Sequence, residues 1–362
     1  MKTLNRQQLS DILYGCAILG TGGGGELAEG FEYIDKAFAA GKEFKLVGID
    51  QLDDEKMLCT PYMLGALAID EDESYQGLPQ SNQVSIMTAF ERLKEYSGVE
   101  FHGTICCELG GSNTAISFYL AAMIDGVIVD ADPAGRAVPE ITHSTYYLNN
   151  LPAAPIITAN EFGECFICEN VVDDQRAEHI VRALAMVSRN DIAAIDHALP
   201  VSVMKNAVIK GTISKALSIG EAYRYAKEQN IDIAQCVAEI GEGVVRFRGQ
   251  VIDFEFNTLE GFTIGSFCIA GKGKFAGKEY KINVKNENLS ATLNDTIDVT
   301  IPDLICCLDM DKQEPVTNPN LREGMNVAIV ILPAPKEFIT DKGLEVFGPK
   351  YLGLKTSYVP AI

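Results

Sequence analysis

The sequence has 362 residues, of which 47% are hydrophobic and 22% are charged, and this composition is typical of a folded globular protein. Its 30 Lys and Arg residues against 50 Asp and Glu residues give a formal net charge of −20, which excludes nucleic acid and anionic membranes as expected partners. No apolar run reaches the roughly 18–20 residues that span a bilayer, and the polar residues 5–8 leave no signal-peptide core. We therefore expect a soluble, cytoplasmic protein, and two domains because one core rarely grows to this length.

Glycines stand between two predicted helices near the start of the chain. Residues 9–19 and 27–38 carry apolar side chains at helical spacing, and the six residues between Leu19 and Glu26 read GTGGGG. A dinucleotide-binding fingerprint would follow a strand, and a P-loop would end in Gly-Lys-Ser/Thr, so neither interpretation fits. The run is either a tight turn or a loop whose backbone N–H groups contact a ligand. On the second interpretation, the predicted substrate-binding glycines are Gly22, Gly23, Gly24 and Gly25.

Short apolar strands and helices alternate over the first part of the chain. We predict strands at 44–49, 57–60, 103–107 and 127–130 and helices at 84–96 and 114–124. This order is typical of an α/β fold, in which helices pack against a mostly parallel sheet. We assign residues 1–168 to this N-terminal domain.

The pattern changes beyond residue 170. Predicted helices at 177–187, 213–229 and 233–240 are followed by predicted strands at 251–256, 280–284, 297–301 and 327–332. This order predicts a C-terminal mixed α+β domain, rich in strands, over residues 169–362.

The ten cysteines lack the paired spacing of a zinc ribbon. Cys106 and Cys107 are neighbours in an apolar, strand-like run, and so are Cys306 and Cys307, so the two side chains of each pair point to opposite faces. We interpret most of the ten as reduced core residues.

A cluster of polar side chains follows the predicted strand at 127–130. Asp130 and Asp132 are two residues apart, so an extended backbone points both carboxylates the same way. A turn-rich loop with one cation comes next, and the last two members face together if Pro139 begins a helix. The candidate catalytic residues of this cluster are Asp130, Asp132, Arg136, Glu140 and His143.

Three interpretations of the cluster stay open. Asp132, Glu140 and His143 are residue types that bind a divalent metal such as zinc. Alternatively, the cluster holds a water and a substrate through general acid–base contacts, with His143 titrating near neutrality. In the third interpretation, Asp130 and Asp132 form salt bridges with Arg136 in a structural turn.

A second group of polar residues lies at residues 106–113, where a predicted strand is connected to a predicted helix by a loop with two glycines. Glu108 stands at the end of the apolar strand and is a candidate catalytic base. Gly111, Ser112 and Asn113 are candidate substrate-binding residues, because a helix N-terminus offers free N–H groups. The other histidines, His102, His179 and His197, lack a spaced partner and are interpreted as structural.

These motifs together resemble the S-methyl thiohydantoin desulfurase family, long described only as a domain found beside hydantoinase and oxoprolinase genes. The resemblance continues through the second half of the chain and covers nearly all of it. The matching segments are GCAILGTGGGG at 15–25, ELGGSN at 108–113, DAD at 130–132, GRAVPE at 135–140, KGTIS at 210–214, GFTIG at 261–265, NENL at 286–289, IPDLI at 301–305 and GLEVFGP at 343–349.

The resemblance implies a hydrolase that replaces sulfur at the ring carbon between two nitrogens of a hydantoin-like or thiohydantoin-like small molecule. On this hypothesis Asp132 or Glu108 activates the water, directly or through a metal. Arg136 and the glycine-loop amides then stabilise the developing charge. His143 protonates the leaving sulfur or ring nitrogen.

Two other functions remain open at this stage. The chain could be a non-catalytic ligand-binding or accessory subunit of a hydantoinase or oxoprolinase partner, or it could bind a nucleotide through the glycine run. We also expect a homo-oligomer, because symmetric association is common among soluble enzymes. If the second domain closes over the first, Lys210 or Asn286 joins the site.

Overall fold

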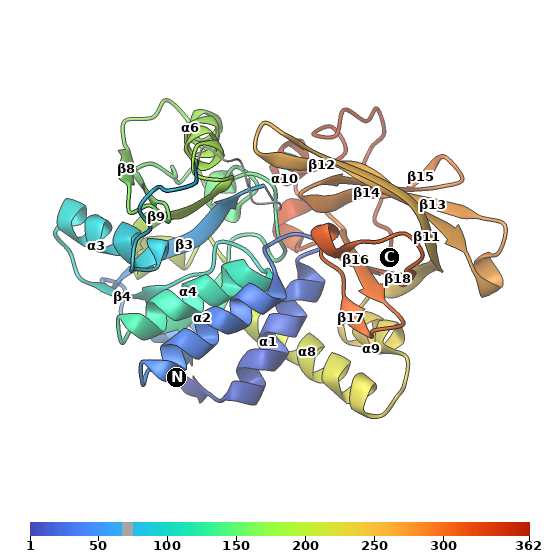
Figure 1. Cartoon of the computed structure of the whole chain (residues 1–362), viewed down its shortest axis with the longest axis horizontal. Coiled ribbons are helices and arrows are strands. Elements are labelled where there is room, and N and C mark those ends of the chain that lie inside the picture. Colours follow the sequence, from blue (N-terminus) through green and yellow to red (C-terminus); the bar gives the residue numbers. More distant parts are fainter. Residues whose placement is uncertain (67–74) are drawn as a thin grey trace.

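The computed structural model of the chain describes residues 1–66 and 75–362, and its N-terminal part is built on one sheet. The strands of this sheet are β1 (Lys2–Leu4), β2 (Phe44–Val47), β3 (Met57–Gly65), β4 (Phe101–Thr104), β5 (Val127–Val129), β7 (Ile156–Ala159), β8 (Cys165–Cys168) and β9 (Asp191–Pro200). Their order is β1-β2-β5-β4-β3-β9-β7-β8. Figure 1 shows β3, β4, β8 and β9 of this sheet on one side of the molecule and the strands of the C-terminal part on the other. The central run β2-β5-β4-β3 is parallel, and the strands outside it pair antiparallel.

Helices cover both faces of this sheet. One face shares an apolar core with α1 (Arg6–Leu19), α2 (Leu27–Ala39), α3 (Ser85–Ser97) and α4 (Gly111–Met123). The other face is covered by α5 (Thr145–Leu148), α6 (Asp174–Met186) and α7 (Val201–Met204). Residues 111–122 of α4 are all buried, which fits a helix that is apolar nearly all round and lies at the centre of its layer.

Local sequence explains where several of these helices begin. Asn5 caps α1 by accepting from the N–H of Gln8, whose side chain in turn accepts from the N–H of Asn5. Asp173 caps α6 through one hydrogen bond, which its side chain accepts from the N–H of Arg176.

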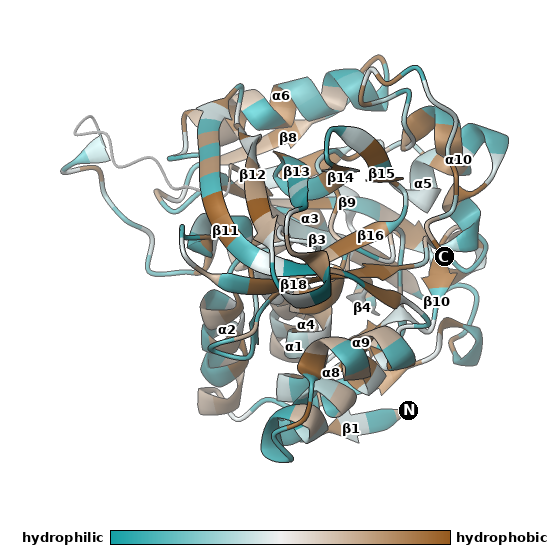
Figure 2. Cartoon of the chain, turned by 90° about the vertical axis from the view of Figure 1, so that its right-hand side faces the viewer, coloured by the Kyte–Doolittle hydropathy of each residue, from teal (hydrophilic) through white to brown (hydrophobic). Residues whose placement is uncertain are grey.

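The second sheet is antiparallel throughout and belongs to the C-terminal part. Its strands are β11 (Val244–Leu259), β12 (Phe262–Gly271), β13 (Glu279–Lys285), β14 (Glu287–Leu293), β15 (Thr296–Thr300), β16 (Leu304–Asp309), β17 (Glu314–Pro315) and β18 (Asn326–Leu332). They are arranged in the order β15-β14-β13-β12-β11-β18-β16-β17. Figure 2 shows how hydrophilic and hydrophobic residues alternate along β11, as expected for a strand with one covered face.

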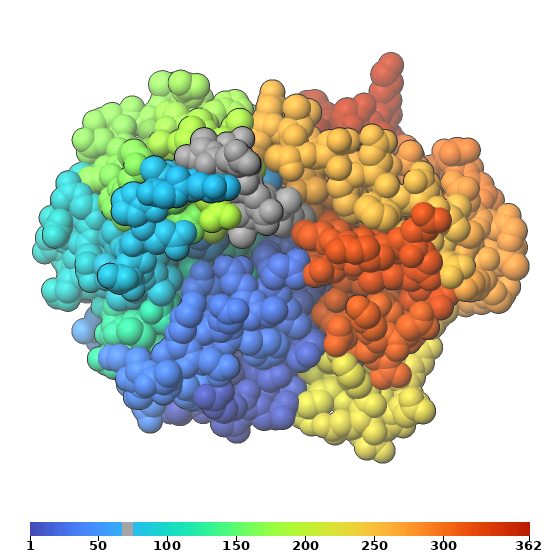
Figure 3. Space-filling model, in the orientation of Figure 1, coloured from blue at the N-terminus to red at the C-terminus, as the bar shows by residue number. Residues whose placement is uncertain are grey.

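Smaller elements join the two parts. The strands β6 (Ala131–Asp132) and β10 (Ile209–Lys210) form a separate antiparallel pair. The helix α8 (Thr212–Glu228) packs along α1, and α9 (Ile233–Ile240) packs on β11 and β18. The remaining elements are α10 (Asp341–Val346), η1 (Ile49–Gln51), η3 (Gly273–Phe275), η4 (Asn318–Asn320) and η5 (Lys336–Phe338). Figure 3 shows the two parts packed directly against each other.

The predicted α/β class with a second, strand-rich domain is confirmed, and the predicted elements at 84–96, 213–229 and 233–240 correspond to α3, α8 and α9. The second sheet begins only at β11, and β9 joins the first sheet, so residues 169–362 contribute to both sheets. The condition under which Glu140 and His143 were to face together is not met: Pro139 begins no helix, and residues 139–144 form turns and bends that lead into α5. None of the described helices is long and apolar enough to cross a membrane.

Candidate functional site

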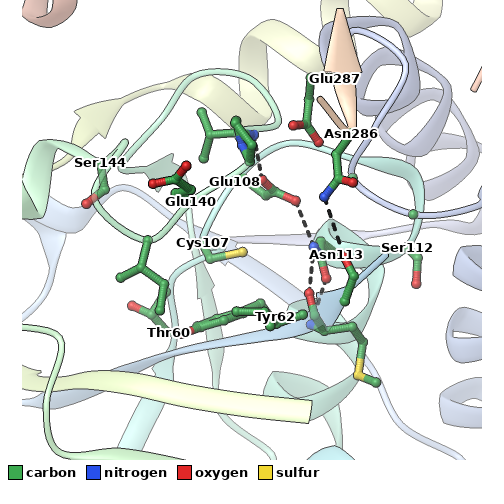
Figure 4. A pocket seen from close by; sticks show the side chains of 18 of the residues that line it. Thr60, Tyr62, Cys107, Glu108, Ser112, Asn113, Glu140, Ser144, Asn286 and Glu287 are labelled. Atoms are coloured by element: carbon green, nitrogen blue, oxygen red, sulfur yellow. Dashed lines mark hydrogen bonds between the residues drawn. The ribbon is translucent and has the colours of Figure 1, made fainter. Parts of the chain in front are cut away.

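A cavity of about 230 Å³ lies where the two sheets meet (Figure 4). The N-terminal part lines it with the second half of β3, the loop between β4 and α4, and the glycine loop at residues 20–25. The C-terminal part lines it with the start of β14. Because β3 and β4 are parallel strands, the cavity lies at the carboxyl edge of the parallel centre, where ligands of α/β sheets usually bind.

Glu108 follows β4, and its carboxyl group is buried in the wall of the cavity. Its Oε1 accepts a hydrogen bond from Nδ2 of Asn113 at 2.7 Å, and its Oε2 accepts one from the N–H of Val138 at 2.8 Å. Asn113 is itself fixed by two hydrogen bonds with the backbone of Met63 in β3. Burial raises the pKa of Glu108 to about 7, although both hydrogen bonds oppose this shift. The carboxyl group is therefore held in place and changes its protonation near neutral pH.

The glycine loop packs closely against the start of α4. The carbonyl of Gly24, whose φ is +76°, accepts hydrogen bonds from the N–H groups of Ser112 and Asn113, each at 3.1 Å. A Cβ at Gly24 would lie 2.5 Å from the Cα of Gly110, so only glycine permits this approach. These two amides of α4 are therefore used within the protein, which corrects the prediction that they are free for a ligand. The glycines that line the cavity are Gly22, Gly24 and Gly25.

The opposite wall contains a buried aspartate–histidine pair on β9. Nδ1 of His197 lies 2.7 Å from Oδ1 of Asp196, and Nε2 lies 3.3 Å from the carbonyl oxygen of Leu151. Tyr62 donates to the second oxygen of Asp196 at 2.9 Å. Both ring nitrogens of His197 thus face acceptors, which favours the imidazolium form. Burial alone would lower the pKa of His197, but Asp196 raises it above its ordinary value.

The Asp–His pair is braced by an aromatic ring. Tyr146 stacks on His197 with ring centroids 4.1 Å apart, and its hydroxyl lies 3.1 Å from that of Thr60. The backbone of His197 has a φ of +41°, an uncommon conformation for a residue with a side chain. This wall is polar and almost fully buried.

Arg136 joins the two domains rather than facing the cavity. It is 1% exposed, and Nη1 donates to the carbonyl oxygens of Pro302 and Asp303. Nη2 donates to the carbonyl oxygen of Asn288 and to the hydroxyl of Thr21. Nε donates to the carbonyl oxygen of Ala137. All three guanidinium nitrogens therefore have partners within the protein, and neither of the predicted salt bridges to Asp130 and Asp132 forms.

Asp130 and Asp132 are also engaged by the protein itself. Asp130 accepts hydrogen bonds from the backbone N–H and the hydroxyl of Ser214 in α8. Oδ2 of Asp132 accepts from the N–H groups of Ala134 and Gly135 and so shapes the turn after β6. Burial raises the pKa of Asp132 to about 7, although these two hydrogen bonds and the side chain of Thr212 oppose this shift.

Glu140 and His143 contact the C-terminal part in different ways. Oε1 of Glu140 pairs with Lys285 and accepts from the hydroxyl of Tyr351. Burial alone would raise the pKa of Glu140, but its charged and hydrogen-bonding neighbours lower it to about 2. His143 packs against the rings of Phe347 and Tyr351, and burial lowers its pKa to about 4, so the imidazole is neutral near pH 7.

The predicted metal site is not supported by this arrangement. Within residues 1–66 and 75–362, no group of three or more His, Cys, Asp and Glu side chains is placed to hold a metal ion. Glu140 and His143 both contact Tyr351, whereas Asp132 accepts hydrogen bonds from the N–H groups of Ala134 and Gly135 in the turn after β6.

The structure thus divides the candidate residues into two groups. Those that line the cavity are Gly22, Gly24, Gly25, Glu108, Ser112, Asn113 and Glu140. Those outside its described lining are Gly23, Gly111, Asp130, Asp132, Arg136 and His143. Of the two residues expected to join on domain closure, Asn286 lines the cavity, whereas Lys210 forms an ion pair with Asp50.

Sequence reasoning missed the cavity residues Asp196, His197 and Glu287. A signal was present in each case: Asp196 and His197 directly follow the apolar residues 192–195, and Glu287 lies in the NENL segment at 286–289. The predicted core role of the cysteines is compatible with the structure, where all ten are free thiols. Six of them are buried, and Cys165 is exposed. Cys107 lines the cavity, and burial raises the pKa of its thiol well above the usual value.

Fold and site together define a two-domain α/β protein with an acidic cavity between its domains. Family models cover almost the whole chain: the S-Me-THD-like N-terminal domain matches residues 7–170, and the S-Me-THD-like C-terminal domain matches residues 172–361. The chain therefore belongs to this family, and the predicted resemblance to S-methyl thiohydantoin desulfurases is confirmed.

Known structures support the same fold. The chain is 21% identical to a protein from Chromobacterium violaceum whose X-ray crystal structure is known, with a TM-score of 0.78 over 100% of both chains. This likeness shows a shared fold alone. Among curated proteins, no match was found.

Proposed function

We propose that the protein is a hydrolase that acts on a hydantoin-like or thiohydantoin-like ring through a water activated by Glu108. The family to which the chain belongs supports this substrate class. The observation that carries the assignment is the position of Glu108: it lies in the cavity wall, is fixed by two hydrogen bonds, and has a pKa of about 7. A general base is most effective when its pKa is close to the working pH.

The charge of the cavity supports an uncharged ligand that is rich in N–H groups. The cations of the described lining, Arg182 and His197, already have anionic partners in Glu178 and Asp196. The acidic lining residues are Glu26, Glu29, Glu108, Glu140, Glu178, Asp191, Asp196 and Glu287. A carboxylate or phosphate ligand would meet repulsion here, whereas ring N–H groups can donate to carboxylates.

Two separate observations weigh against the nucleotide-binding and accessory-subunit hypotheses. The phosphates of a nucleotide would lie among carboxylates, and Gly24 already occupies the amides of Ser112 and Asn113 that could have held them. A salt bridge between Asp130 and Arg136 with no cavity, beside a broad exposed apolar patch, would favour an accessory role. Instead, Asp130 bonds to Ser214, and a cavity is present.

The proposed reaction replaces the sulfur substituent without opening the ring. Ionised Glu108 takes a proton from water, and the water oxygen bonds to the ring carbon between the two nitrogens. The bond from this carbon to sulfur then breaks, and the sulfur leaves as a thiol after taking up one proton. The second proton of the water moves from the added oxygen to a ring nitrogen as the ring carbonyl forms. One water is consumed, and no oxidant or reductant is needed.

The test is thiol release from S-methyl thiohydantoin by the purified protein, followed with a thiol reagent and by mass spectrometry of the ring product. We expect Glu108→Gln to lower kcat roughly 10²–10⁴-fold, because the amide cannot accept the proton. Glu55→Gln is a matched control, since Glu55 is exposed and does not belong to the described lining of the cavity. Unchanged turnover by Glu108→Gln would contradict the assignment, and no thiol release by the wild-type protein would refute the proposed function.

A further inference from the structure

Glu287 is a carboxyl group of the cavity whose burial the contacts within the protein do not explain. It begins β14 of the C-terminal sheet, yet its side chain is only 2% exposed and lines the cavity that Glu108 also lines. Its Oε2 is buried and has no hydrogen-bond partner among the residues that the structure describes. A buried polar atom without a partner costs roughly 1–3 kcal/mol, so its persistence next to a cavity points to a ligand contact.

The glycine loop makes room for this carboxyl group. A Cβ at Gly23 would lie 1.9 Å from Oε1 of Glu287, closer than any two non-bonded atoms approach. Hydrogen bonds also connect the glycine loop to the C-terminal part: the carbonyl oxygens of Thr21 and Gly22 accept from the backbone N–H groups of Asn288 and Asn318. The absence of a side chain at Gly23 is thus explained by the position of Glu287, although Gly23 itself lies outside the described lining.

The surroundings of Glu287 favour its uncharged form. Burial raises its pKa well above the usual value, and the nearby carboxyl group of Glu108 raises it further. The guanidinium of Arg136 opposes this shift, but its nitrogens donate to carbonyl and hydroxyl oxygens rather than to Glu287. Two carboxyl groups of one cavity therefore have pKa values that are pushed apart, the arrangement by which active sites assign one base and one acid.

We propose that Glu287 is the catalytic acid of this site: its neutral carboxyl group donates a hydrogen bond to the ligand and, in the hydrolysis, its proton to the departing sulfur. This inference rests on the proposed function and adds a residue from the other domain to it. In one turnover, Glu108 gains the proton of water and Glu287 loses its own to the thiol. Proton exchange with solvent then restores both groups, so the cycle balances.

The leaving group provides the direct test. Ring substrates with an alkylthio and a nitrophenylthio substituent differ in how much their sulfur needs a proton when it departs. We expect Glu287→Gln to lose roughly 10²–10⁴-fold in kcat on the alkylthio substrate and less than about tenfold on the nitrophenylthio substrate. Glu279→Gln, a change at an exposed position of the neighbouring β13, is the control and should retain both rates. Equal losses on both substrates, or no loss, would overturn the proposal.

A second measurement separates failure of this inference from failure of the proposed function. At about pH 8.5, where Glu108 and Asp132 are ionised, the infrared difference spectrum between the wild-type protein and Glu287→Gln should show a protonated carboxyl band. Absence of the band would overturn the acid role whether or not thiol is released. Its presence without thiol release by the wild type would refute the desulfurase reaction and leave Glu287 as a hydrogen-bond donor to another ligand.

Discussion

Two segments of the N-terminal domain are alike in sequence and differ in role. Residues 104–113 and 129–143 each pass from a buried strand into a loop with acidic residues. In the first segment, Glu108 remains at a cavity. In the second, Asp130 and Arg136 direct their hydrogen bonds to the protein itself, the former to Ser214 and the latter largely to backbone carbonyls.

The difference shows that an ionisable side chain is available for chemistry where the fold leaves it at a cavity, as it leaves Glu108 but not Asp130 or Arg136. Arg136 is the clearest case, because its partners Asn288, Pro302 and Asp303 lie more than 150 residues further along the chain. Spacing in the sequence therefore indicates where polar residues gather, but it does not indicate which of them a ligand can reach.

The largest expected effect is loss of folding when Arg136 is replaced. Arg136→Met would leave several buried carbonyl oxygens at the domain junction without donors, so we expect the free energy of unfolding to fall by at least about 3 kcal/mol. Urea denaturation followed by circular dichroism measures this change. If Arg136→Met kept its stability and lost only turnover, Arg136 would belong to the chemistry, and the comparison between the two segments would fail.

A smaller effect is expected at the Asp196–His197 pair in the wall of the cavity. His197 has a pKa above its usual value of 6.5 because of Asp196, so its stabilising effect is complete below pH 6.5 and is lost as the pH rises through the raised pKa. We expect Asp196→Asn to lower the free energy of unfolding by roughly 2–4 kcal/mol near pH 6 and by less in alkaline solution. A destabilisation that stays constant or grows with pH, measured by urea denaturation, would show that His197 is neutral.

The smallest effect is expected at Asp130. This side chain is partly exposed and bonds to Ser214, so Asp130→Asn should cost about 1 kcal/mol of stability and leave thiol release per folded molecule within about twofold of wild type. Thermal denaturation and the thiol assay check both parts. A much larger loss of turnover would return Asp130 to the candidate catalytic residues.

Much of the fold was predictable because it depends on local patterns. The run of apolar residues with helical spacing at 233–240 matches α9, and the alternation of strands and helices indicated the α/β class. The return of β9 to the first sheet was not predictable, since it depends on pairing with β3, which lies more than 120 residues earlier.

The site was predictable in part for the same physical reason. Glu108 and Asn113 are five residues apart, so their contact follows from one strand–loop–helix turn. Glu287 and His197 reach the cavity from separate strands, and their roles depend on burial and on distant partners such as Gly23 and Leu151. The glycine run drew attention to the right loop, although its glycines serve close packing as much as ligand contact.

The most direct test of the account is the pH dependence of kcat/KM for thiol release by two matched variants. Burial raises the pKa of both Glu108 and Asp132 to about 7, and only Glu108 lies in the described lining of the cavity. A base must be ionised, so wild-type activity should rise with pH through an apparent pKa near 7. We predict that Asp132→Asn keeps this rise in its folded fraction and that Glu108→Gln abolishes it. If kcat/KM no longer increased with pH in Asp132→Asn but still did so in Glu108→Gln, Asp132 rather than Glu108 would be the base.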